Sequence, residues 1–299
     1  MLAGIEAGGT KMVCVVGKDA DQILERTSIA TTTPDDTIPA IITFFKHCEQ
    51  QFEPIEAIGI AAFGPVDINP RSVNYGQVGL TPKLAWQHFN WVHALMEGFS
   101  LPVNVDTDVN GAALGEWRRG AAQNLDTFLY LTVGTGIGGG GLINGKLLHG
   151  RFHPEMGHIR LPHDWQRDPF RGCCPYHNDC LEGLASGEAM LQRWGEKAQN
   201  LAPSHPAWEL EAEYLALAVT NFLFTFSPQR ILLGGGVMKH DGLIEEVRRK
   251  TLEYCGGYLP YLPQEIETLI TPPQLGDLAG SYGALALAAN CISGRSTSP

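Results

Sequence analysis

Short apolar runs separated by glycine turns dominate the first 30 residues of the chain. Apolar residues flank the turn "EAGGTK" on both sides within residues 1–17, and this pattern predicts a hairpin of two strands. Residues 21–30 predict a third strand. In the segment 33–52 the period changes, because Ile38, Ile41 and Phe45 recur at helical spacing after a capping start. The chain is therefore expected to open with three strands and a helix.

Predicted strands, glycine turns and helices continue to alternate to the end of the chain. The segment 55–67 predicts a buried strand that ends in a Gly-Pro turn, and the segment 101–120 predicts a strand followed by a helix from about Val109. The segment 127–150 repeats the order of strand, glycine turn and strand. Later elements are a helix at about 208–226, a strand and turn at 230–238, a helix near 242–255, and a short strand, loop and terminal helix within 266–290. The repeated hairpins predict two duplicated lobes with a cleft between them.

The apolar residues of the segment 150–185 follow neither the two-residue period of a strand nor the 3.6-residue period of a helix. It is dense in His, Pro, Gly and Cys, and it predicts an insertion that needs something other than a hydrophobic core to hold it. Its densest part, "RGCCPYHNDCLEG" (171–183), has Cys174, His177 and Cys180 at intervals of three. Two thiolates and an imidazole at this spacing fit one tetrahedral Zn²⁺, with a fourth ligand from outside the stretch. Cys173 is a local competitor for that position, and a redox pair or buried free thiols are the alternatives.

Composition narrows the class of protein. A length of 299 residues allows one large domain or two smaller ones. The formal net charge of −11 argues against a nucleic-acid groove or a polybasic membrane surface. No run approaches the roughly 20 apolar residues of a membrane span, and the N-terminus lacks the pattern of a signal peptide. We therefore expect a cytoplasmic protein without nucleic-acid or membrane partners, whose clustered cysteines bind a metal.

Three glycine turns follow predicted strands: "EAGGTK", "TVGTGIGGGG" and "LLGGGVM". Backbone amides, hydroxyls and a lysine in such turns suit a phosphate group, although "EAGGTK" taken alone favours a plain tight turn. None has the spacing of a P-loop or of a dinucleotide fingerprint. Together they favour a nucleotide held between the lobes.

The stretch "NVDTDVNGAA" carries two aspartates, Asp106 and Asp108, just before a predicted helix. A carboxylate at a strand end can accept a proton from an alcohol. A helix N-cap beside a turn aspartate explains the same spacing, and spacing alone favours that alternative.

Six strings occur in order along nearly the whole chain: "IEAGGTK", "AAFGPVD", "DTDVNGAALGE", "LTVGTGIGGGGLINGKLLHG", "HPEMGH" and "CPYHNDCLEG". Together they resemble the ROK family of bacterial sugar kinases, and the last string is similar to its zinc-containing fructokinase members. The resemblance implies an α/β, actin-like ATPase (ribonuclease H-like) fold of the hexokinase superfamily. It predicts a small lobe, 1–118 joined by the helix 280–292, and a large lobe, 119–279. ATP, Mg²⁺ and a hexose would meet between them.

The resemblance also assigns roles to single residues. Asp108 would be the catalytic base. Residues that would bind the sugar are Gly64, Pro65, Asn110, Glu155, His158 and Glu182. Residues that would bind ATP are Gly9, Thr10, Lys11, Thr132, Gly134, Thr135, Gly136, Gly187, Gly234, Gly235, Gly236, Val237 and Met238. His158 would complete a structural zinc site with Cys174, His177 and Cys180.

One position departs from the family pattern, because Glu6 stands where the family commonly has aspartate. Its expected link to Mg²⁺ is therefore less direct. The activity that the resemblance favours is phosphorylation of D-fructose to fructose 6-phosphate by a homodimer. The alternatives are a kinase for glucose, mannose or an N-acetylhexosamine, and a sugar-sensing regulator without catalysis. The regulator is disfavoured because the phosphate hairpin begins at residue 5, which leaves no room for a DNA-binding domain ahead of it.

Overall fold

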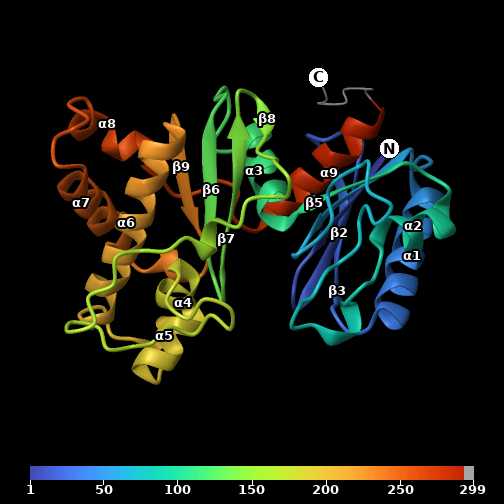
Figure 1. Cartoon of the computed structure of the whole chain (residues 1–299). Coiled ribbons are helices and arrows are strands. Elements are labelled where there is room, and N and C mark those ends of the chain that lie inside the picture. Colours follow the sequence, from blue (N-terminus) through green and yellow to red (C-terminus); the bar gives the residue numbers. More distant parts are fainter. Residues whose placement is uncertain (293–299) are drawn as a thin grey trace. The chain divides into compact units, whose positions relative to one another are not determined.

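Strands of the chain gather into two five-stranded sheets in the computed structural model, which describes residues 1–292 (Figure 1). The strands are β1 (Leu2–Ala7), β2 (Lys11–Gly17), β3 (Ile23–Ala30), β4 (Ala57–Ala62), β5 (Val103–Thr107), β6 (Phe128–Val133), β7 (Ile137–Ile143), β8 (Lys146–Leu147), β9 (Arg230–Gly234) and β10 (Ile270–Thr271). The α-helices are α1 (Pro34–Gln51), α2 (Trp91–Phe99), α3 (Asp108–Arg119), α4 (Leu181–Ala185), α5 (Gly187–Trp194), α6 (Ala207–Phe226), α7 (Leu243–Cys255), α8 (Leu262–Leu269) and α9 (Ala279–Ile292).

Both sheets have the same topology. The first has the order β3-β2-β1-β4-β5 and the second has the order β8-β7-β6-β9-β10. In each sheet three antiparallel strands come first in sequence, and two strands parallel to the first of them follow. The two glycine turns of the hairpins β1–β2 and β6–β7 therefore occupy equivalent places. The duplication of architecture expected from the sequence is present at the level of strand order.

Alternation along β1 and β4 gives the first sheet two different faces. Ile5, Ile58 and Ile60 are fully buried in one core cluster with side chains of α1 and α2. Each such side chain stabilises the fold by about 1.5–3 kcal/mol through burial. The opposite face carries Gly4 and Gly59. A Cβ atom at Gly59 would lie 2.0 Å from the carbonyl oxygen of Ala284 in α9, so glycine is required there for α9 to pack this closely.

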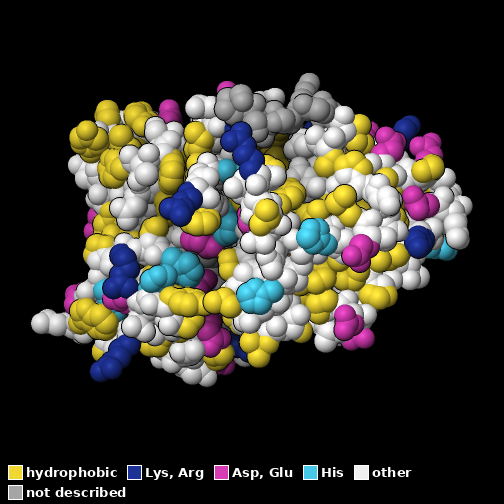
Figure 2. Space-filling model, turned by 45° about the vertical axis from the view of Figure 1, so that its right-hand side comes forward, with side chains coloured by type: hydrophobic (Ala, Val, Ile, Leu, Met, Phe, Trp, Pro, Cys, Tyr) yellow, Lys and Arg dark blue, Asp and Glu magenta, His cyan; other side chains and the backbone are white. Residues whose placement is uncertain are grey.

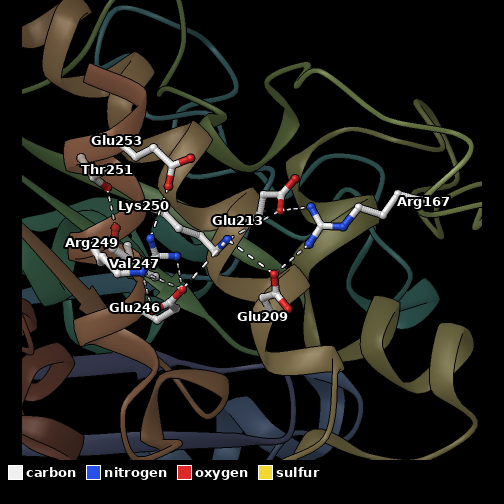
Figure 3. Close-up of polar contacts among 9 residues, drawn as sticks. All are labelled: Arg167, Glu209, Glu213, Glu246, Val247, Arg249, Lys250, Thr251 and Glu253. Atoms are coloured by element: carbon white, nitrogen blue, oxygen red, sulfur yellow. Dashed lines mark hydrogen bonds and ion pairs between the residues drawn. The ribbon is translucent and has the colours of Figure 1, made fainter. Parts of the chain in front are cut away.

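The second sheet packs against α6, α7 and α8 through a separate apolar core. A charged cluster lies beside that core, where α7 meets α6 (Figure 3). The ammonium group of Lys250, which is only 6% exposed, lies 3.8 Å from Glu213, 3.9 Å from Glu209 and 4.0 Å from Glu246. Arg167 pairs with Glu209 and Glu213. A buried ammonium needs such partners, so the cluster fixes α7 against α6 without touching the candidate site.

The chain divides into two compact units. The first comprises Met1–Asn124, His149–His153 and the described residues from Gln274 onward, and the second comprises Leu125–Leu148 and Pro154–Pro273. The chain thus enters the first unit for five residues between β8 and Pro154. The lobe boundaries expected from the sequence stay a prediction.

The surface adds two observations. On the face drawn in Figure 2, Lys and Arg side chains are scattered singly among acidic, apolar and histidine side chains. Within residues 1–292, none of the helices combines the length and hydrophobicity that a membrane crossing requires.

Candidate functional site

The junction between β5 and α3 carries the predicted catalytic base. Thr107 caps the helix by accepting a hydrogen bond of 3.2 Å from the Asn110 amide, so neither aspartate is the N-cap. Asp108 is the first helical residue and is partly exposed, and its Oδ1 accepts a hydrogen bond of 2.8 Å from the Val109 amide. The positive end of a helix favours the ionised carboxylate. Asp108 is therefore a partly exposed hydrogen-bond acceptor at the start of a fixed helix.

Asp106 and Asn110 lie behind this junction, in the interior. Asp106 is 3% exposed, and Asn110 is fully buried. One carboxylate oxygen of Asp106 accepts from the Thr107 amide at 2.7 Å and from the Asn110 side chain at 2.7 Å. Its other oxygen lies 2.8 Å from Nε2 of His149. Asn110 thus supports the junction, and its contact with a sugar stays a prediction.

Glu6, on β1, belongs to the same unit. Burial raises the pKa of its carboxyl group, the guanidinium of Arg26 opposes this, and the charge of Asp108 raises it further. A Cβ atom at Gly280 would lie 2.4 Å from Cδ of Glu6. The glycine therefore makes room for the longer side chain where the family commonly has aspartate.

Two other predicted motifs complete the first unit. The turn between β1 and β2 closes with a hydrogen bond of 3.1 Å from the Gly8 amide to the Lys11 carbonyl, and it leaves Lys11 exposed. A second cation lies beside the turn, because a Cβ atom at Gly9 would be 3.0 Å from Cε of Lys83. Gly64 and Pro65 follow β4. A Cβ atom at Gly64 would lie 3.8 Å from the ring of His153.

The second unit contains a cavity of 510 Å³ at the predicted nucleotide turns. Five of the residues that line this cavity were predicted to bind ATP: Gly134, Thr135, Gly187, Gly236 and Val237. The other lining residues were not predicted from the sequence: Glu188, Leu191, Lys197, Ala198 and Gln199. Thr132, Gly136, Gly234, Gly235 and Met238 lie beside these turns and do not line the cavity. The Gly187 amide donates to the Gly134 carbonyl at 2.7 Å, which fixes the start of α5 against the glycine turn.

Glu182, on α4, contacts the same glycine turn. Its Oε2 accepts a hydrogen bond of 2.9 Å from the amide of Ile137, the first residue of β7. The 3₁₀ turn Met156–His158 approaches Ile137 too, since a Cβ atom at Gly157 would lie 2.0 Å from the Ile137 carbonyl oxygen. Glu155 precedes that turn and lines a second cavity of 400 Å³ with residues of α6. The predicted sugar-binding residues of this unit thus cluster around the start of β7.

The Cys/His residues of the segment 150–185 form a compact cluster. The ligand atoms of His158, Cys174, His177 and Cys180 all lie within 4.8 Å of one another. Nδ1 of His158 is 3.8 Å from Sγ of Cys174 and 3.6 Å from Sγ of Cys180, and Nδ1 of His177 is 3.6 Å from Cys174. Cys173 points elsewhere, with its sulfur 3.9 Å from the Ser186 hydroxyl.

These separations can be compared with those in a zinc site. Zn–S bonds of about 2.3 Å and Zn–N bonds of about 2.0 Å at the tetrahedral angle separate sulfur from nitrogen by about 3.5 Å. The donor set therefore fits a tetrahedral zinc ion. Burial raises the pKa of Cys180, so that the neutral thiol is favoured until a cation displaces its proton.

A buried polar network supports the same segment from the other side. The carboxylate of Asp168, which is 3% exposed, accepts two hydrogen bonds from Arg193 at 3.1 and 3.0 Å and one from the Tyr214 hydroxyl at 2.6 Å. The ring of His163 also binds the Asp168 carbonyl at 2.9 Å. This network joins the segment to α5 and α6 independently of any metal.

Comparisons with known proteins identify the family of the chain and the fold that it shares. Residues 2–291 match the profile of the ROK family. The chain is 44% identical to a fructokinase of Zymomonas mobilis over 95% of both chains, and 28% identical to a glucokinase of Streptomyces coelicolor over 95% and 96%. Its fold matches the ROK hexokinase of Thermus thermophilus with a TM-score of 0.80, at 27% identity, over 98% of this chain and 99% of that one.

Proposed function

Because the chain belongs to the ROK family, we propose that it is an ATP-dependent hexose kinase that converts D-fructose into fructose 6-phosphate. The observation that carries the proposal is the 44% identity to a fructokinase along nearly all of both chains, against 28% for a glucokinase. The nucleotide-sized cavity at the glycine turns and the aspartate at the start of α3 support it.

Asp108 is the proposed base. The fructose 6-hydroxyl oxygen attacks the γ-phosphorus of ATP, the bond from that phosphorus to the ADP oxygen breaks, and the hydroxyl proton passes to the Asp108 carboxylate. Such a transfer demands little covalent chemistry of the protein beyond orientation and stabilisation of charge. The partly exposed carboxylate, fixed at a helix start, supports this role.

Backbone amides and cations of the glycine turns would hold the nucleotide. Gly134, Thr135 and Gly187 line the cavity together with Lys197, and amides and ammonium groups are suited to phosphate oxygens. In the first unit, Lys11 and Lys83 flank the hairpin turn and offer further positive charge. Mg²⁺ accompanying ATP would neutralise the developing charge. Glu6, whose carboxyl pKa is raised by burial and by Asp108, is the residue proposed to face that cation through water.

One Zn²⁺ is proposed to bind His158, Cys174, His177 and Cys180. Four protein ligands leave no open position for substrate, so the ion would be structural. Nδ1 of His158 faces the sulfurs. Its Nε2 is then available to a sugar hydroxyl, and the metal would orient that ring. A reducing cytoplasm is the proposed location, because cysteines that bind a metal must stay reduced, and the family resemblance supports a homodimer.

The test is a coupled ADP-release assay with fructose, glucose, mannose and N-acetylhexosamines. We expect the highest kcat/KM for fructose. A higher kcat/KM for glucose or mannose would contradict the assignment of fructose and leave a hexose kinase. Absence of ADP release with every hexose would contradict the kinase and favour a sugar-sensing regulator.

A further inference from the structure

His149 and Asp106 form an ion pair behind the proposed base. Nε2 of His149 lies 2.8 Å from Oδ2 of Asp106, and the side chains are 37% and 4% exposed. The same nitrogen is 3.4 Å from the Asn110 side chain. His149 lies near the end of the string "LTVGTGIGGGGLINGKLLHG", but the family resemblance assigned it no role, and the phosphoryl transfer described above does not use it.

The pair supplies a hydrogen-bond partner to the Asp106 carboxylate, which has almost no access to water. The Thr107 amide and the Asn110 side chain bind Oδ1 of Asp106, and His149 supplies the donor for Oδ2. A buried carboxylate is costly unless it is paired and hydrogen-bonded. Thr107 in turn caps α3. Asp106 therefore joins the end of β5, the cap and the first turn of α3 into one hydrogen-bonded unit.

His149 belongs to a short segment that leaves one unit of the chain for the other. His149–His153 belongs to the first unit, whereas the residues on either side of it belong to the second. At the other end of this short segment the ring of His153 lies beside Gly64, a predicted sugar-binding residue. Both predicted sugar-binding motifs of the first unit thus contact a histidine from the same five residues.

We propose that His149 is a positioning residue for the phosphoryl transfer: its charged ring holds Asp106 and thereby fixes the first turn of α3, where the base Asp108 lies. This rests on the proposed kinase activity. His149 acts through Asp106 and touches neither the sugar nor ATP in this role.

Because the ring of His149 can gain or lose a proton, its positioning role is expected to depend on pH. Burial lowers its pKa, but the hydrogen bond and the charge of Asp106 outweigh burial and raise the pKa above its ordinary value of 6.5. Within residues 1–292, Asp106 of β5 is the one charged group with a resolved effect on the ring, and the group facing it from α3 is the neutral Asn110 amide. The ion pair is complete below about pH 6.5 and is lost as the pH rises through the raised pKa. Neutral His149 can still donate from Nε2, so only the charge disappears.

Two variants separate charge from hydrogen bonding. His149→Gln keeps a side-chain donor and has no charge at any pH, and Asp106→Asn removes the partner. We expect His149→Gln to lower kcat for fructose about 10- to 100-fold at pH 6.5, because small displacements of a catalytic group are costly. In wild type we expect kcat to fall as the pH rises through the His149 pKa, and we expect His149→Gln to abolish this fall. His47→Gln, on the exposed face of α1, is the matched control and should leave the profile unchanged.

A second readout does not depend on activity. Proton–nitrogen correlation spectra of histidine-labelled protein give the His149 pKa directly. It should exceed 6.5 in wild type and fall below 6.5 in Asp106→Asn, where burial acts unopposed. A His149 pKa unchanged by Asp106→Asn would overturn the pairing. A His149→Gln enzyme with the kcat and pH profile of wild type would overturn the positioning role alone, whereas an inactive wild type would overturn the proposed function.

Discussion

Two aspartates on either side of Thr107 lie in opposite surroundings. Asp106 is buried and bound by three donors, whereas Asp108 is partly exposed at the helix start. Their spacing in the sequence predicted one helix cap and one turn residue, and only the family pattern distinguished Asp108 as the base. The structure supplies the physical difference. A buried carboxylate whose oxygens already accept hydrogen bonds can hold neighbouring elements in place, whereas an accessible carboxylate can accept a proton from a substrate.

Glu182 provides a test at the scale of one residue. Glu182→Ala removes the acceptor of the Ile137 amide, and Ile137 is only 4% exposed. A buried amide without a partner costs about 1–3 kcal/mol. We therefore expect a lower free energy of unfolding in urea, together with a higher KM for fructose.

Glu182→Gln is the matched variant. It keeps an oxygen for the Ile137 amide and loses the charge, so its stability should stay close to wild type while the KM for fructose still rises. Equal destabilisation by both variants would contradict the role given to this hydrogen bond.

Single residues without a motif were beyond the reach of sequence reasoning. Lys83 and Lys197 reach their sites from segments whose local pattern says nothing about chemistry, and His149, inside one of the six family strings, was assigned no role. The Cys/His cluster was different, because three of its members are close in sequence at a spacing that metal geometry restricts. The fourth, His158, came from the family resemblance, and its ring lies with the other three in the structure.

At the scale of elements, the cap of α3 connects stability with activity. Thr107→Ala removes the hydrogen bond to the Asn110 amide, and loss of a cap costs about 0.5–2 kcal/mol. We expect lower stability in urea and a lower kcat, because Asp108 begins this helix. Thr107→Ser should retain both.

Asn90→Ala is the control for this prediction. Asn90 caps α2 in the same unit by accepting from the His93 amide at 2.9 Å. It should lower stability without lowering kcat. If Thr107→Ala lost stability and kept the wild-type kcat, the helix start would not be needed to orient the base.

The proposed zinc ligands in the segment 150–185 provide the second test at the scale of elements. Purified protein should contain one zinc per chain by elemental analysis. Cys174→Ser should lose the metal and lower the apparent Tm by roughly 10 °C or more, since metal binding contributes directly to folding. Cys173→Ser is the matched control, because the Cys173 sulfur faces Ser186 instead of the cluster. Loss of zinc in both variants, or a zinc-free protein of unaltered stability, would refute the assignment.

The helices that sequence analysis missed are short. α2, α4, α5 and α8 have 9, 5, 8 and 8 residues, too few for a 3.6-residue period to stand out. Trp91, which stacks on Trp86 with ring centroids 5.2 Å apart, begins α2. Long elements with clear periods, such as α1 and α6, were predicted nearly to their ends.

At the scale of the whole molecule, two sheets of identical strand order place a glycine hairpin at equivalent positions. The sequence predicted this repeat from the pattern of turns. It did not predict that residues 149–153 leave the second unit for the first, because a five-residue excursion has no signature in hydrophobic pattern. Asp108 belongs to the first unit, and Glu155, His158 and Glu182 belong to the second.

The measurement that tests the account most directly compares wild type with Asp108→Asn in fructose and ATP, following ADP and fructose 6-phosphate together. Wild type should form the two products in equal amounts. Asp108→Asn should form both about 10²- to 10⁴-fold more slowly, the range expected for loss of a general base, with unaltered stability. ADP without sugar phosphate in wild type, or near wild-type turnover in Asp108→Asn, would contradict it.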